Sequence, residues 1–155
     1  MKRILFFLMC ICLASTAFAD VNTPDKNAQL FQAAKDGNFS AVQTALADGA
    51  DVNVKKITDG VTALMMASQN GHTEVVKLLL EKGADINVKA SDGTTALWQA
   101  SQRGYPEVVK LLLEKGADVN VKATINNVEW TALKIAKRMG RADIVQLLKK
   151  AGAKE

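Results

Sequence analysis

The chain has 155 residues, with 20 basic and 16 acidic side chains and a formal net charge of +4. A balance so small and so mixed in sign does not indicate a nucleic-acid partner. Both cysteines, Cys10 and Cys12, fall in segment 1–19, so the rest of the chain has no thiol for a disulfide, a metal ligand or a nucleophile.

Segment 1–19 has the pattern of a secretory signal peptide. Lys2 and Arg3 precede an apolar run, and Ala17-Phe18-Ala19 is a small-x-small cleavage site. We expect cleavage after Ala19, which leaves a nearly neutral mature chain of about +2 that begins at Asp20. An uncleaved anchor is disfavoured because the run is short, and a lipoprotein because neither cysteine follows small residues. Later apolar runs are far below membrane length, so no span is expected in the mature chain.

After a segment at 20–26, the sequence repeats itself. Residues 59–91 and 92–124 are both 33 residues long and differ at eight positions. A weaker copy precedes them at an offset of 34 residues, and a fourth follows at an offset of 36. We therefore predict four units, at about 27–58, 59–91, 92–124 and 125–155.

Each unit predicts two helices and a turn. Thr62 and Thr95 are expected to be N-caps of a first helix that ends near Gly71 or Gly104. The second helices are predicted at 73–81 and 106–114, with Pro106 at the first helical position, followed by helix-ending glycines. Asp-Gly at 59–60 and 92–93 predicts the tip of a projecting finger.

The units resemble ankyrin repeats. They share Thr-Ala-Leu-x-x-Ala, then Glu-Val-Val-Lys-Leu-Leu-Leu, then Gly-Ala-Asp-Val/Ile-Asn, and the similarity extends over about 27–152. The resemblance implies an all-α solenoid of four helix–turn–helix units with β-turn or hairpin fingers, as one domain over 27–155. Met65, Trp98 and Lys134 stand where the family often has a bridging histidine, so we expect less rigid bonding between units.

Unequal residues at equivalent positions indicate how the units stack. Ala41 and Thr44 replace the large apolar residues of later second helices, so that face should point towards a preceding unit. Lys149 replaces Leu80 and its equivalents, so the opposite face should point towards a following unit. We therefore expect Leu80 to be covered, and both ends of a complete four-unit array to be polar.

The sequence offers little for catalysis. His72 is the single histidine, its equivalents are Tyr105 and Arg141, and we interpret it as structural. Carboxylates such as Asp85 and Asp118 recur because the unit recurs, and nucleophile and phosphate-binding motifs are not evident. We expect no enzyme activity, no cofactor and no metal site.

The resemblance implies binding of another protein through the concave face and fingertips. Residues that differ between near-identical units are the best candidates, because the scaffold does not require the difference. Trp98 is predicted as the anchor at the rim, with packing between first helices as the alternative; for Trp130 a structural role is the alternative. The predicted protein-binding residues are Val61, Met65, Asn70, Thr94, Trp98, Gln102, Arg103, Trp130 and Lys134.

The expected function is that of an exported protein, in a bacterial periplasm, that is monomeric without its partner. Small exported bacterial members of the family resemble either immunity proteins that inhibit a toxin or proteins that support an envelope or stress-defence enzyme. The alternative is a structural or self-associating envelope scaffold. The sequence alone does not identify the partner.

Overall fold

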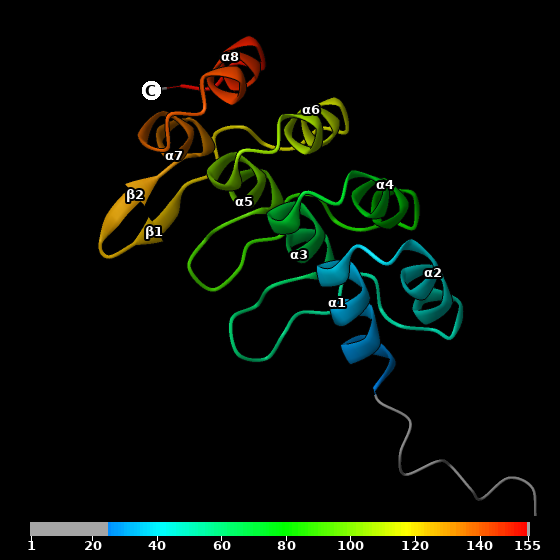
Figure 1. Cartoon of the computed structure of the whole chain (residues 1–155). Helices are drawn as coiled ribbons and strands as arrows, with labels where there is room; N and C mark the ends of the chain where they lie inside the picture. Colours follow the sequence, from blue (N-terminus) through cyan, green and yellow to red (C-terminus); the bar gives the residue numbers. More distant parts are fainter. Residues whose placement is uncertain (1–24, 155) are drawn as a thin grey trace, which may run out of the picture.

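A computed structural model describes residues 25–154, which form a stack of helix pairs (Figure 1). Segment 1–19, with its predicted signal peptide, and most of segment 20–26 lie outside the described residues. The elements are α1 (Lys26–Asp36), α2 (Phe39–Ala47), α3 (Ala63–Asn70), α4 (Thr73–Glu81), α5 (Ala96–Arg103), α6 (Pro106–Glu114), β1 (Ala123–Ile125), β2 (Val128–Trp130), α7 (Ala132–Arg138) and α8 (Ala142–Lys150).

The helices form two rows. The first helices of the units, α1, α3, α5 and α7, lie side by side next to the fingers, and the second helices, α2, α4, α6 and α8, form the outer row (Figure 1). Each helix contacts its partner in the same unit and its equivalent in the next unit. The predicted helix–turn–helix solenoid is confirmed.

The helix ends follow the sequence signals. The Thr62 and Thr95 hydroxyl oxygens accept hydrogen bonds from the backbone N–H groups of Met65 and Trp98, at 3.4 and 3.3 Å, which satisfies otherwise unpaired donors. Gly71 ends α3 in the left-handed conformation, with φ of 76°. The bounds of α4 and α6 are those predicted.

The core runs between the two rows and through all four units. Its recurring members are a leucine and a small alanine on each first helix. On the second helices they are valines and leucines in α4 and α6, Ile144 and Leu148 in α8, and the smaller pair Val42 and Ala45 in α2. Ala67, Ala100 and Ala136 have no exposed surface, and their small side chains allow neighbouring first helices to approach closely. Each buried leucine or valine contributes about 1.5–3 kcal/mol. Because the main contacts between helices are within a unit or between neighbouring units, stability is shared along the stack.

An asparagine ladder, which the sequence pattern did not predict, ties the units together. In each "Gly-Ala-Asp-x-Asn" segment, the aspartate carboxylate accepts a hydrogen bond from the N–H of the asparagine two residues later. The asparagine Oδ1 in turn accepts from a backbone N–H about one unit further on. These bonds join Asn53 to Asp85, Asn87 to Asp118 and Asn120 to Lys154, at 2.7, 2.8 and 2.9 Å. Asn27, on α1, makes a similar bond to the N–H of Asp51 within the first unit, at 3.0 Å.

His72 also connects two units. Its Nε2 lies 2.9 Å from the carbonyl oxygen of Lys35, and its ring lies against Gly37, where a Cβ would collide with it. Tyr105 lies against Gly71 in the same way one unit later. The structural interpretation of His72 is supported, although the sequence pattern did not show this contact.

The finger before the fourth unit, at residues 123–130, differs from the two earlier fingers, at residues 54–61 and 88–94. The three residues inserted after the third unit allow β1 and β2 to pair antiparallel, with Ile125 opposite Val128 and Ala123 opposite Trp130 (Figure 1). Asn126 and Asn127 form the connection with φ of 52° and 60°, the left-handed pair that a tight hairpin turn requires. The two earlier fingers lie close enough that the N–H of Ser91 donates a hydrogen bond to the carbonyl oxygen of Asp59 at 2.9 Å.

The predicted stacking direction holds, with one correction. Val75 and Leu78 are buried, whereas Thr44 is exposed, and Lys149 is exposed as predicted. Leu80 is only half-buried, although we expected full cover by the third unit. The second helices contact one another less than the first helices do, so the outer row leaves part of this position open to water.

Candidate protein-binding surface

The nine predicted binding residues divide into three groups by exposure. Asn70, Arg103 and Lys134 are exposed, and Val61, Gln102 and Trp130 are half-buried. Met65, Thr94 and Trp98 are buried, at 2%, 1% and 5% exposure. The predicted set is therefore a mixture of surface groups and groups that the stack covers.

Two grooves bring six of these residues together. The first, of about 370 Å³, lies between the second and third units, and we call it the 2–3 groove; Val61, Met65 and Thr94 are among its lining residues. The second, of about 320 Å³, is the 3–4 groove, which Trp98, Gln102 and Trp130 help to line. Asn70, Arg103 and Lys134 line neither groove.

Trp98 is not the exposed anchor that its sequence position suggested. It packs with Ala123 and Ile135 in a small apolar cluster, which Ile125 and Trp130 cover in part. The prediction that Trp98 stands at the rim is therefore wrong. The alternative, packing between neighbouring first helices, agrees with its contact with Ile135 of α7, and the hairpin before α7 covers it further. Its indole contributes only to the wall of the 3–4 groove.

Trp130 is the more accessible of the two tryptophans. It is half-buried at the end of β2, and the Arg138 guanidinium carbon lies 4.9 Å from the centre of its ring. A guanidinium at this distance over an aromatic face is attracted by the ring and holds it in place. The contact between Arg138 and Trp130 was not predicted from the sequence, because Arg138 lies on a helix and Trp130 on a strand.

The exposed charge along the first helices changes from one end to the other. Asp36 ends α1 and the neutral Asn70 ends α3, whereas Arg103 ends α5 and Arg138 ends α7. On the hairpin, Glu129 pairs with the Lys122 ammonium at 2.8 Å. The hydrogen bond and charge of Lys122 hold the pKa of Glu129 below its usual range. The fourth-unit end of this surface is therefore basic.

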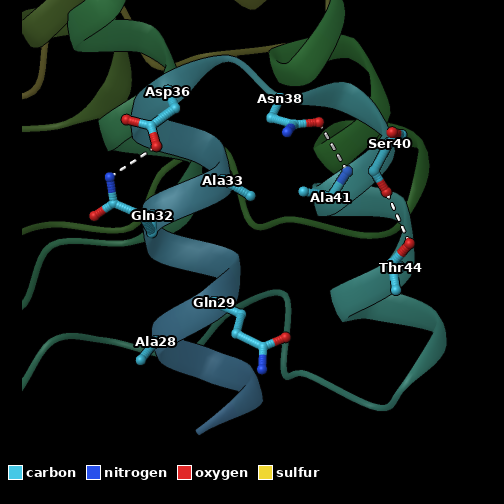
Figure 2. Close-up of a pocket in the computed structure, with 9 residues that line it drawn as sticks. All are labelled: Ala28, Gln29, Gln32, Ala33, Asp36, Asn38, Ser40, Ala41 and Thr44. Carbon is cyan, nitrogen blue, oxygen red and sulfur yellow. Dashed lines mark hydrogen bonds between the residues drawn. The ribbon is translucent and has the colours of Figure 1, made fainter. Parts of the chain in front are cut away.

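A third groove, of about 680 Å³, lies between α1 and α2 at the first-unit end (Figure 2). It is wide because small or polar groups occupy the face where later units carry valine and leucine. Several of its polar atoms are joined to one another: Gln32 donates to Asp36 at 2.8 Å, and the Thr44 hydroxyl donates to the carbonyl of Ser40 at 3.0 Å. We interpret it as the polar end face that the sequence predicts.

The single histidine and the recurring aspartates, interpreted above as structural, make contacts within the scaffold. His72 contacts Lys35, and Asp85 and Asp118 form the turns that hold the asparagine ladder. Among residues 25–154, no three His, Cys, Asp or Glu side chains are grouped as metal ligands would be. Within the same range, no helix has both the length and the apolar character needed to cross a membrane.

The comparison with protein families agrees with the geometry. The family model described as ankyrin repeats in three copies matches residues 30–123, more than half of the chain. No curated protein matches the chain.

Proposed function

Because this chain belongs to the ankyrin-repeat family, whose members are in general protein-interaction scaffolds, we propose that it is exported and binds one specific partner protein. The binding surface consists of the fingers and the exposed side of the first helices. On this proposal the chain acts in a bacterial periplasm, either as an immunity or inhibitor protein or in support of an envelope or stress-defence enzyme.

One observation carries the proposal. Units two and three are nearly identical, yet the side chains that line the grooves between fingers differ. The differing pairs are Val61 and Thr94, Met65 and Trp98, and Met66 and Gln99, and all six residues line a groove. The second helices, by contrast, differ only at their first residue. Five of the eight differences, at positions 61, 65, 66, 70 and 91 and their equivalents, lie in the fingers and first helices. Variation concentrated on that side of a nearly constant scaffold is what recognition of a partner would require.

The test of the binding surface is capture of the partner from the exported protein fraction with matched variants. Arg103→Glu with Lys134→Glu reverses two exposed charges on the first helices. Lys77→Glu with Lys110→Glu makes the same change on the outer row, where both lysines are exposed. The partner should be lost with the first pair and retained with the second. Retention by the first pair and loss by the second would move the interface to the outer row.

Export has its own test. The signal pattern in segment 1–19 supports the proposal, although it lies outside the described residues. Intact mass of the protein recovered from the periplasm should correspond to a chain that starts at Asp20. Recovery in the cytoplasm with residues 1–19 attached would contradict export without affecting the binding surface.

A further inference from the structure

The 3–4 groove differs in chemistry from the equivalent 2–3 groove. In the 2–3 groove the third unit contributes Asp92, Thr94 and Gln99. The equivalent residues in the 3–4 groove, 36 positions later, are Val128, Trp130 and Ile135. Three polar groups, one of them acidic, are thus replaced by three apolar groups on the same framework.

Hairpin geometry gathers the apolar groups on one side. Successive side chains of a strand point to opposite faces, and directly paired residues share a face. Ile125 and Val128 therefore lie on the same hairpin face as Ala123 and Trp130. Glu129 lies on the opposite face, where Lys122 neutralises it. The hairpin thus turns its apolar face, without a carboxylate, towards the groove.

The groove is only partly filled by this chain. Val128 is 50% exposed and Met139 45% exposed, and both line it. They are two of the four large hydrophobic residues that stand exposed in the described part of the chain. At the same place, the indole N–H of Trp98 is buried and has no hydrogen-bond partner. A buried donor left unpaired is costly, and an entering oxygen acceptor would relieve it once the wall shifts.

The charge around the groove has a single sign. Arg138 is the one charged residue in its lining, and Arg103 follows the lining residue Gln102 at the end of α5. Both arginines are exposed. The 2–3 groove has the opposite character, because Asp59 and Asp92 line it. A ligand of the 3–4 groove should therefore carry negative charge beside an apolar group.

From these observations we infer that the 3–4 groove is the docking site for an acidic segment of a partner protein, which inserts one large apolar side chain between the hairpin and α7. A carboxylate of the segment pairs with Arg138. The inference rests on the proposed function, which it deepens by naming the chemistry of the partner.

The test uses a random displayed peptide library selected against the mature protein. Enriched peptides should be net acidic and should share one large apolar residue. Their affinity, measured by anisotropy of labelled peptides, should fall at least about tenfold with Arg138→Glu and with Val128→Asp. Val128→Asp places at that exposed position the residue type found at Asp92. The control Lys150→Glu reverses an exposed charge on α8 and should leave affinity within about twofold.

The tryptophans report occupancy of the groove directly. Both tryptophans of the chain, Trp98 and Trp130, line it, so bound peptide should alter their emission. Failure to enrich any peptide, enrichment of basic peptides, or acidic peptides that bind both groove variants as tightly as wild type would each overturn the inference. If the native partner binds both groove variants normally but is lost with Arg103→Glu and Lys134→Glu, the proposed function stands and this docking site does not.

Discussion

Replacement of Trp98 by alanine distinguishes a packing residue from an exposed anchor. Trp98 is 5% exposed and packs with Ala123 and Ile135. Removal of a buried aromatic side chain costs about 3–5 kcal/mol. We expect about 3 kcal/mol, because the neighbouring groove lets water enter the space, and because the unpaired indole N–H means that no hydrogen bond is lost. For an array of this size the melting temperature should fall by about 10 °C.

The assay is thermal unfolding followed by far-ultraviolet circular dichroism, with Trp98→Phe as the matched control. Phenylalanine keeps an aromatic ring in the cluster and gives up only the unpaired N–H, so its cost should stay below about 1.5 kcal/mol. A melting temperature for Trp98→Ala within about 2 °C of wild type would show that Trp98 does not hold the hairpin on the stack. Trp98 would then again be a candidate surface residue for partner binding.

Three further predictions concern the stack and its charges. Leu80→Lys should lower the free energy of unfolding by about 2 kcal/mol, whereas Lys149→Leu should change it by less than about 0.5 kcal/mol; equal shifts in thermal melts would contradict the stacking direction. Asn53→Ala removes two bonds to the next unit, to Asp85 N–H at 2.7 Å and the Gly83 carbonyl at 3.2 Å, and should cost about 1–2 kcal/mol in urea unfolding; no change would show that the ladder is not stabilising. Because the pKa of Glu129 is lowered in the folded state, its pairing stabilises above the ordinary carboxyl pKa and fades as pH falls through the lowered value. Lys122→Ala should therefore raise the pKa of Glu129 in an NMR titration and reduce stability at neutral pH but not in acid; an unchanged midpoint would contradict the pairing.

Helix ends were predictable because the same capping residues recur at equivalent positions in successive units. Thr62 and Thr95 occupy the same place in units that are nearly identical, and the backbone has the same need for an N-cap at both. The glycine after each first helix ends that helix in every unit, because the left-handed conformation required there is favourable for glycine. These are local effects, and local effects can be read from a single sequence.

The sequence left two interpretations of Trp98 open, an anchor at the rim and packing between neighbouring first helices. It could not choose between them, because the choice depends on contacts with the next unit. The structure buries Trp98, as it buries the equivalent Met65, and the hairpin adds to its cover. The hairpin arises from Asn126 and Asn127 in an insertion whose path the repeat pattern does not define. The Asn53 bond to Asp85 likewise depends on the register between units. The sequence feature that could have indicated this bond is an asparagine that recurs two residues after the aspartate in successive units.

The central claim is that a partner protein binds along the fingers and first helices, and amide hydrogen exchange of the complex tests it most directly. Bound partner should slow exchange in the fingers, at 54–61, 88–94 and 123–130, and at the exposed ends of α5 and α7. Peptides from the outer helices α4 and α6 should exchange as they do in the free protein. Protection confined to α4 and α6, with unchanged exchange in the fingers, would contradict the claim.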